Sequence, residues 1–195
     1  MLQGKNITKF FGKKLILNDI SLFLEKGTST AIKGRNGAGK STLLSILAGY
    51  LQPDKGQVIA DGKIGYIPQQ DVLFEELKVK DNIIFWAKAS RQNPDSEMFK
   101  LFEIEAYQSK KVKELSGGMK KALSICCCLL HDPPIIIMDE PFTALDIYYK
   151  EALITVLKSL KERDKTLVYT SHNLDEMQAL NSEIYSLEKG DLFLY

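Results

Sequence analysis

The apolar positions of this sequence change period along the chain, from strand-like to helical and back. The first 33 residues alternate as short strands do, and Leu22 and Leu24 lie on one face of such a strand. After a glycine-rich turn, apolar residues recur at helical spacing and stop near Gly49 and Pro53. We therefore predict, in chain order, short strands within 1–33, a helix that starts near 41, strands at 57–60 and 64–69 on either side of Asp61-Gly62, and helical residues from about 79 to 106 that are interrupted at Asn93-Pro94.

The second half alternates between strand and helix. Its most informative segment is 135–138, an apolar and largely β-branched run without polar alternation, bracketed by prolines. Such a run is typical of a strand covered on both faces, so we predict a mainly parallel core sheet with flanking helices. The other predicted elements are a helix at 117–130, a helix at 147–163, a strand at 166–171, a short helix, and a hairpin around Lys189-Gly190.

This order of elements predicts an α/β chain with an N-terminal antiparallel β subdomain and an inserted helical subdomain. The pattern changes to helical at about 71–120, which is the best candidate for the insert. The sequence has no repeat, no low-complexity tract and no long linker. We therefore expect residues 1–195 to form a single domain.

Composition narrows the possible partners. With 26 Lys and Arg against 25 Asp and Glu, the net charge is +1, which gives no global reason to bind nucleic acid. No apolar run approaches the length of about 20 residues that spans a bilayer, and the N-terminus lacks the core of a signal peptide. We expect a cytoplasmic chain whose membrane part, if any, is another protein. The adjacent cysteines 126–128 have neither disulfide nor metal spacing and are predicted to be structural.

A glycine-rich octapeptide, residues 34–41, lies between a predicted strand and a predicted helix with the spacing of a P-loop. Its glycines let backbone N–H groups turn toward a phosphate, and the helix that follows adds its positive end. The alternative is a glycine-rich turn without a ligand. The residues that we predict to bind nucleotide here are Gly34, Arg35, Asn36, Gly37, Ala38, Gly39, Lys40, Ser41 and Thr42.

Two carboxylates, Asp139 and Glu140, end the apolar strand about 100 residues later. Burial explains the apolar run but not the acidic pair. The carboxyl end of a parallel strand faces the ligand crevice, so Asp139 is predicted to hold Mg²⁺ and Glu140 to orient or deprotonate a water.

A third motif, Leu115-Ser116-Gly117-Gly118-Met119, leads into a helix. Read locally, it is a serine N-cap followed by two small residues. A helix that begins with small residues also leaves its N–H groups accessible to an anion. The P-loop, this LSGG motif and the DEP sequence at 139–141, in this order, resemble the nucleotide-binding domain of an ABC (ATP-binding cassette) ATPase, and the resemblance covers essentially the whole chain.

The resemblance implies a P-loop NTPase fold, ATP and Mg²⁺ as ligands, and roles for further residues. Phe11 matches an aromatic that stacks on adenine, although Phe10 next to it, or a core position for Phe11, are alternatives. Gln69 matches a glutamine that contacts Mg²⁺ and water, with Gln70 as the weaker candidate. Asp146 matches a loop that crosses a dimer interface, and His172 matches the switch histidine at the γ-phosphate. Mg²⁺ would thus be held by Ser41, Gln69 and Asp139, and catalysis would rest on Glu140, His172 and Gln69.

The signature of the family is not matched in full. Met119 stands where glutamine is usual after LSGG, which looks tolerated because Ser116 and the backbone of Gly117 and Gly118 make the contact. Thr143 stands where many members have serine and keeps the hydroxyl. Five lysines nearby either add positive potential near a triphosphate or form a solvated basic face: Lys110, Lys111, Lys113, Lys120 and Lys121.

In the mechanism that this resemblance implies, two cassettes pair head to tail, and each ATP lies between the P-loop of one and the LSGG helix of the other. The favoured interpretation is the ATPase subunit of a membrane transporter, with a second nucleotide-binding subunit and separate transmembrane permease subunits as partners. It would lie at the inner face of the membrane. A short helical insert, Met119 and the stretch 139–146 resemble export-type cassettes. In the segment 71–87, Leu73, Phe74, Phe85 and Trp86 form either a permease groove or subdomain core. The alternatives are a soluble ATPase of an assembly system, such as iron-sulfur cluster assembly, and a nucleotide sensor without turnover.

Overall fold

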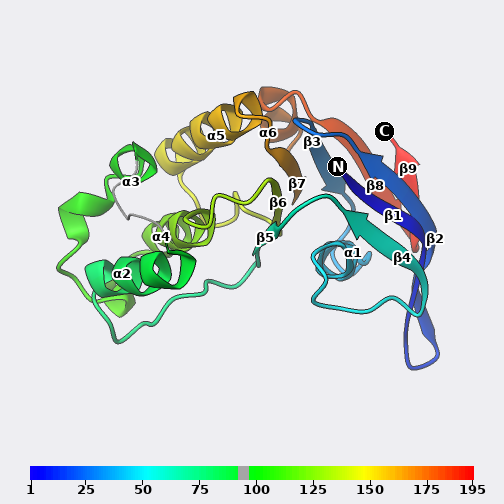
Figure 1. Cartoon of the computed structure of the whole chain (residues 1–195), viewed down its shortest axis with the longest axis horizontal. Coiled ribbons are helices and arrows are strands. Elements are labelled where there is room, and N and C mark those ends of the chain that lie inside the picture. Colours follow the sequence, from blue (N-terminus) through cyan, green and yellow to red (C-terminus); the bar gives the residue numbers. More distant parts are fainter. Residues whose placement is uncertain (92–96) are drawn as a thin grey trace.

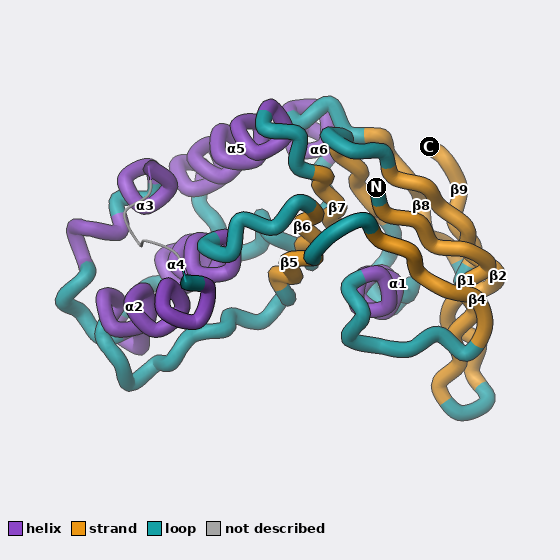
Figure 2. The backbone as a smooth tube through the Cα atoms, in the orientation of Figure 1, coloured by secondary structure: helices purple, strands orange, loops and turns teal. Residues whose placement is uncertain are grey.

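The computed structural model describes residues 1–91 and 97–195, which form two sheets and a set of helices (Figures 1 and 2). Its strands are β1 (Leu2–Phe11), β2 (Lys14–Leu24), β3 (Ser29–Lys33), β4 (Lys55–Ala60), β5 (Ile64–Ile67), β6 (Ile135–Met138), β7 (Thr166–Thr170), β8 (Glu183–Glu188) and β9 (Asp191–Leu194). Its α-helices are α1 (Lys40–Leu47), α2 (Val79–Ser90), α3 (Glu97–Leu101), α4 (Gly117–Leu129), α5 (Ile147–Glu162) and α6 (Leu174–Ala179), and its 3₁₀ turns are η1 (Ile104–Tyr107) and η2 (Val112–Glu114).

The larger sheet has the strand order β5-β6-β7-β3-β8-β9. All neighbours in it run parallel except β9, which pairs antiparallel with β8. The smaller sheet, β2-β1-β4, is antiparallel. The predicted mainly parallel core sheet and N-terminal antiparallel sheet are therefore confirmed. The strands on either side of the Asp61-Gly62 turn do not pair with each other, because β4 joins β1 and β5 joins β6.

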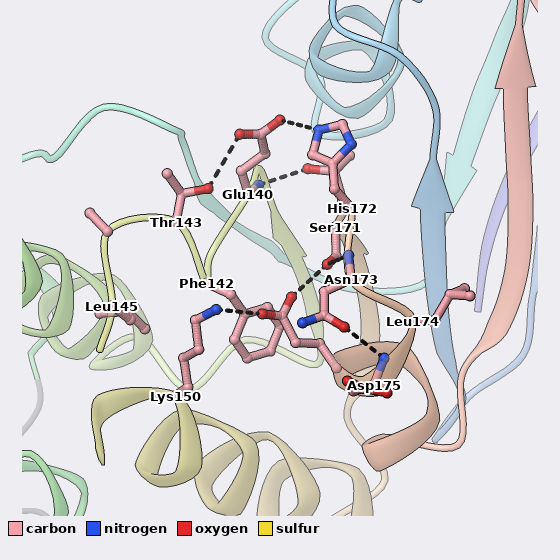
Figure 3. A pocket seen from close by; sticks show the side chains of 13 residues that line it. Glu140, Phe142, Thr143, Leu145, Lys150, Ser171, His172, Asn173, Leu174 and Asp175 are labelled. Carbon is pink, nitrogen blue, oxygen red and sulfur yellow. Dashed lines mark hydrogen bonds and ion pairs between the residues drawn. The ribbon is translucent and has the colours of Figure 1, made fainter. Parts of the chain in front are cut away.

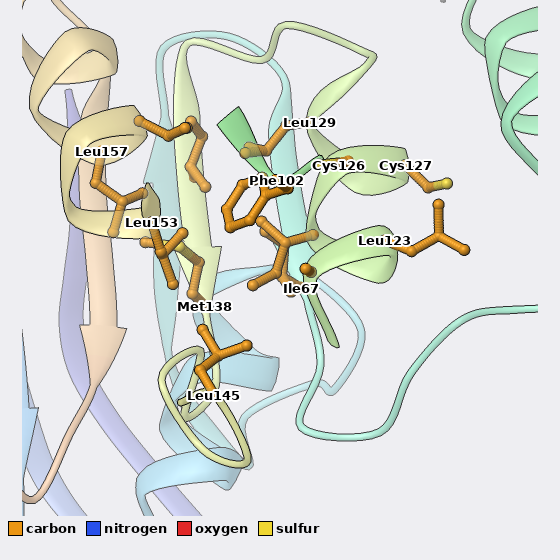
Figure 4. Close-up of a cluster of buried hydrophobic side chains, with 14 of the residues drawn as sticks. Ile67, Phe102, Leu123, Cys126, Cys127, Leu129, Met138, Leu145, Leu153 and Leu157 are labelled. Carbon is orange, nitrogen blue, oxygen red and sulfur yellow. The ribbon is translucent and has the colours of Figure 1, made fainter. Parts of the chain in front are cut away.

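The central strand β6 explains the apolar run without alternation. Ile135 and Ile137 belong to a buried cluster with α1 and the small sheet, whereas Ile136 and Met138 belong to a second cluster with α4 and α5. Figure 4 shows part of the second cluster. Because both faces are covered, every side chain of β6 is buried, as the sequence predicts for such a strand.

Helices α2 and α3 lie beside α4, away from the small sheet (Figure 1). The helical pattern predicted for 79–106 is partly correct. α2 occupies 79–90, but the second segment divides into α3 and η1, because Glu103 adopts a left-handed φ of 49° that an α-helix cannot contain. The predicted interruption at Asn93-Pro94 lies outside the described residues.

The three cysteines lie on α4, with Cys126 and Cys127 fully buried and Cys128 half-buried. Burial raises the pKa of all three thiols, that of Cys128 to about 12, so they stay protonated at neutral pH. This fits the structural role predicted for them. In the described parts of the chain, no helix has the length and apolar character needed to cross a membrane.

Candidate nucleotide site

The glycine-rich loop connects β3 to α1 with a backbone that requires glycine. Gly37 and Gly39 have φ values of 78° and 107°, a conformation that other residues rarely adopt. A Cβ at Gly39 would also come within 3.2 Å of the Ile16 carbonyl oxygen. The loop thus turns tightly at the start of α1, where no side chain caps the helix and its first N–H groups lack partners within the helix.

The loop folds around the side chain of Lys40, the first residue of α1. Lys40 is only 5% exposed, and its ammonium donates to the carbonyl oxygens of Gly34 at 2.9 Å and Arg35 at 3.4 Å. A buried ammonium needs such partners to offset its lost hydration. Lys40 is therefore held by the loop that it is predicted to assist in binding phosphate.

The acidic pair lies at the carboxyl end of β6, and the neighbouring strand β7 fixes both residues. The Thr170 hydroxyl donates to Asp139 Oδ1 at 2.8 Å and accepts from the Glu140 backbone N–H at 2.7 Å. Asp139 is 3% exposed, and Glu140 has a left-handed φ of 50°. This turn directs the Glu140 side chain away from the strand and into the crevice.

Four predicted or noted side chains converge on the Glu140 carboxylate. Gln69 Nε2 donates to it at 3.3 Å, and Thr143 Oγ1 donates at 3.3 Å. His172 Nε2 lies 3.2 Å from Glu140 Oε1, and Lys40 Nζ lies 3.9 Å from the same oxygen. Figure 3 shows Thr143 and His172 beside Glu140. Segments far apart in the sequence thus present a carboxylate, an ammonium, an amide and an imidazole to one point.

A cavity of about 290 Å³ opens beside this cluster. Phe11 lines it and is 53% exposed, which rules out the alternative of a core phenylalanine. Phe10 is not among the lining residues. An exposed ring at the cavity mouth is suited to stack on a planar base. The cavity is lined by Phe11, Ile16, Asn36, Gly37, Gly39, Lys40, Ser41, Thr42, Gln69 and Glu140.

The LSGG residues lie apart from this cavity, because none of them lines it. Ser116 caps α4, where its hydroxyl accepts from the Met119 backbone N–H at 3.2 Å. Gly118 packs against the loop before α5, where a Cβ would come within 3.1 Å of the Ala144 carbonyl oxygen. Asp146 in turn caps α5, accepting from the Tyr149 N–H at 2.9 Å. The exposed start of α4 and the Asp146 loop therefore form one surface, separate from the P-loop.

Two features of the site were not predicted from the sequence. One is Thr170. A polar residue at the end of a predicted buried strand is a sequence signal that could have identified it as part of the site. The other is a buried carboxylate, Glu176, which accepts from the Ser171 hydroxyl at 2.6 Å and pairs with Lys150 at 3.0 Å. These contacts hold the segment before His172 against α5, beside a cavity of about 690 Å³ (Figure 3).

For the ATP hydrolysis that the sequence predicts at this site, replacement of Thr170 by valine should lower the rate more than the affinity for ATP. Valine fills the same space but leaves Asp139 without its donor and the Glu140 N–H without its acceptor. We expect kcat to fall about tenfold, with a loss of about 2 kcal/mol in unfolding free energy. Steady-state kinetics and denaturant unfolding measure both effects. A Thr170→Ser variant keeps the hydroxyl and should behave like the wild type; equal losses in the two variants would contradict the role of the hydroxyl.

Comparisons with known proteins show the family of this chain. Residues 17–143 match the family model described as ABC transporter. This chain belongs to the ABC transporter ATP-binding family. It is 33% identical to the linearmycin resistance ATP-binding protein LnrL of Bacillus subtilis, over 98% of this chain and 68% of that protein. It is 32% identical to the Nod factor export ATP-binding protein I of Mesorhizobium japonicum, over 94% of this chain and 59% of that protein.

Solved ABC cassettes have the same fold. A dimeric structure of the ATP-binding cassette MJ0796, in a post-hydrolysis state bound to ADP and Pi, matches with a TM-score of 0.87 and 28% identity, over 100% of this chain and 98% of that one. An ATP-binding subunit of an ABC transporter matches with a TM-score of 0.88 and 26% identity, over 100% and 90%. The fold is thus that of an ABC ATPase, whereas the chain spans 59% and 68% of the two curated relatives named above.

Proposed function

We propose that this ABC cassette binds and hydrolyses ATP and uses the cycle to drive substrate movement through separate transmembrane subunits. The observation that carries the proposal is the convergence of Lys40, Gln69 and His172 on the Glu140 carboxylate, at the rim of the P-loop cavity. Phosphoryl transfer depends on positioning and charge neutralisation, which is what these side chains supply.

Each side chain has a distinct part in the reaction that we propose. The loop N–H groups and Lys40 bind the phosphates, and the Phe11 ring stacks on the adenine. Glu140 orients the attacking water and accepts its proton, while His172 donates a hydrogen bond to the γ-phosphate. Lys40 and His172 both lie against Glu140, so the phosphates of ATP would compete with this carboxylate for both side chains.

The donors around the cavity suit Mg²⁺, which prefers oxygen ligands. We propose that the Ser41 hydroxyl, the Gln69 amide oxygen and the Asp139 carboxylate hold this ion together with the nucleotide. Within residues 1–91 and 97–195, no group of three or more His, Cys, Asp or Glu side chains is placed to bind a metal. A magnesium ion bound mainly through nucleotide phosphates fits this arrangement. When bound, the ion neutralises charge that develops on the phosphates.

Separation of the LSGG surface from the P-loop supports a dimer around two ATP. The start of α4, where Ser116 and Gly117 are exposed, lines no part of the P-loop cavity of its own chain. In a head-to-tail pair, each α4 would close the nucleotide site of the other subunit, with Asp146 at the interface. ATP would then join the subunits, and loss of its γ-phosphate would release them.

An exposed apolar patch supports a permease partner. Phe74, Leu77, Ile84 and Phe85 are between 42% and 47% exposed, and the rings of Phe74 and Phe85 meet edge to face at 4.8 Å. Leu73 and Trp86, which the sequence placed in the same group, pack against the buried core instead.

Among the described residues, Trp86 Nε1 is buried without an acceptor, beside a cavity of about 650 Å³ that the exposed residues Phe74, Leu77, Ile84 and Phe85 do not line. We propose that a permease segment covers this patch, which places the chain at the inner face of the membrane.

The direction of transport and the domain organisation are also proposals. Relatives named for Nod factor export and linearmycin resistance support an exporter. We further propose that residues 1–195 form one ABC ATPase domain, in which about 71–120 is a helical signature subdomain. The grouping of α2 and α3 beside α4 supports this division (Figure 1).

Co-purification tests the transporter proposal. The chain should be recovered from detergent-solubilised membranes of its native cells in a stable complex with a membrane-spanning protein. Phe85→Asp should reduce recovery at least about tenfold, because the complex would bury an unpaired carboxylate. Phe193→Asp, at an exposed phenylalanine on β9, is the matched control. A fully active ATPase that joins no membrane protein would instead favour an assembly ATPase.

A further inference from the structure

Lys121 is a buried lysine on the second turn of α4. The residue is only 3% exposed, so the solvated basic face considered from the sequence is wrong for it. The ammonium donates to the carbonyl oxygens of Gln69 at 2.7 Å and Pro68 at 3.3 Å, and lies 3.7 Å from Asp71 Oδ1. A buried charge with three oxygen partners is costly to disrupt, because removal of one side leaves the other unsatisfied. These contacts are called the Lys121 clamp below.

The clamp is one of several contacts between α4 and the segment after β5. The Ser124 hydroxyl accepts from the Val72 backbone N–H at 3.2 Å, and Lys120 pairs with Glu75 at 2.7 Å. The Lys120 pair is more exposed and therefore contributes less. Burial raises the pKa of Asp71, and the charge of Lys121 opposes this rise. The segment from Gln69 to Glu75 is thus attached along one side of a single helix.

The clamp connects two predicted nucleotide contacts, the Gln69 side chain and the start of α4. The Gln69 side chain reaches Glu140 in the P-loop cavity of its own chain. The start of α4, at Ser116, is the surface proposed to contact the nucleotide of the partner. Between them lies little more than one helical turn, from Ser116 to Lys121, which is a stiff connection. A shift of Gln69 toward a bound nucleotide would therefore displace the start of α4.

We propose that Lys121 is a positioning residue that fixes the Gln69 backbone to the LSGG helix, so that occupancy of one nucleotide site sets the geometry of the LSGG surface offered to the other. This inference rests on the proposed function, since it requires two ATP sites in a dimer. The clamp itself touches no substrate and acts through Gln69 and Ser116. The clamp depends on hydrogen bonds to the backbone carbonyl oxygens of Pro68 and Gln69. Any long cationic side chain at position 121 that donates to them would therefore fulfil this role.

The test measures ATP-driven dimer formation in a Glu140→Gln background, where turnover is slow. Lys121→Met keeps the aliphatic packing but removes the ammonium. We expect the ATP concentration at half-maximal dimer, measured by size-exclusion chromatography with light scattering, to rise about tenfold. The affinity of the monomer for a fluorescent ATP analogue should stay within about twofold of its parent, because the P-loop is unchanged.

Two variants make the comparison decisive. Lys120→Met removes the neighbouring exposed pair and should leave dimer formation as in the parent, whereas Lys121→Arg should restore it through its own donors. If Lys121→Met loses cooperative thermal unfolding, Lys121→Gln, which retains one amide donor, replaces it. Equal dimer formation in the Lys120 and Lys121 variants would overturn the inference. A Glu140→Gln parent that forms no dimer with ATP would overturn the proposed function instead.

Discussion

A Glu140→Gln variant is expected to bind ATP and retain a dimer but to release phosphate at least about 100-fold more slowly than the wild type, because an amide cannot accept the proton of the attacking water. Glutamine has nearly the same shape and can keep hydrogen bonds to Gln69 and Thr143. It also removes the negative charge that lies 3.9 Å from Lys40, which leaves that ammonium free to favour a triphosphate. The dimer should therefore persist while ATP stays intact.

Phosphate release and size-exclusion chromatography with ATP measure the two parts of this prediction. Glu162→Gln, at an exposed position on α5, is the matched control and should leave both quantities unchanged. A Glu140→Gln variant that hydrolyses ATP at the wild-type rate would show that Glu140 is not the water-activating group. If the wild type itself binds ATP without releasing phosphate, even with its permease, the chain is a nucleotide sensor.

A Lys40→Met variant is expected to lose ATP binding rather than only turnover. Lys40 is the cation held inside the P-loop, and methionine keeps its stem packing without the charge. Loss of a charged hydrogen bond to the phosphates should raise the Kd for ATP about 10- to 100-fold. Titration with a fluorescent ATP analogue gives the Kd directly. Lys158→Met, at an exposed position on α5, controls for the loss of one positive charge. Wild-type affinity in the Lys40 variant would refute this assignment.

The contrast between these two variants is informative in itself. Both side chains meet at the same cavity, but one should control chemistry and the other binding. The Kd for ATP should therefore distinguish the two variants. Glu140→Gln should bind ATP at least as tightly as the wild type, whereas Lys40→Met should bind it more weakly. A similar affinity loss in both would indicate that the cluster around Glu140 acts as a structural unit, in which either change disrupts the loop.

Much of this site follows from local sequence. The P-loop is predicted because its glycines, strand and helix are contiguous. The acidic pair is predicted because it ends an apolar strand whose burial does not explain two carboxylates. Long-range packing decides the rest. The burial of Lys121 depends on the path of the segment after β5, and the local sequence around Lys121 does not reveal that path. The choice of Phe11 over Phe10 depends on which ring of an exposed strand end faces the cavity.

Other parts of the fold required the tertiary structure for a different reason. The helical pattern at 97–107 contains no proline or glycine, so the left-handed Glu103 that divides it has no local signal. The double role of Thr170 arises only when β7 lies beside β6, which places one hydroxyl between the Asp139 carboxylate and the Glu140 backbone N–H. Such cross-strand contacts depend on the order of the strands in the sheet, and the sequence of a single segment does not determine that order.

The division of β6 between two clusters restricts how this chain can evolve. Ile135 and Ile137 belong to one hydrophobic layer, and Ile136 and Met138 belong to the other. An insertion or deletion of one residue before Asp139 would exchange the two layers and move both carboxylates to the wrong face. Substitution among apolar residues is tolerable here, but a change in length is not. Lineages of this cassette should therefore diverge freely in the identity of these four residues while their number stays constant.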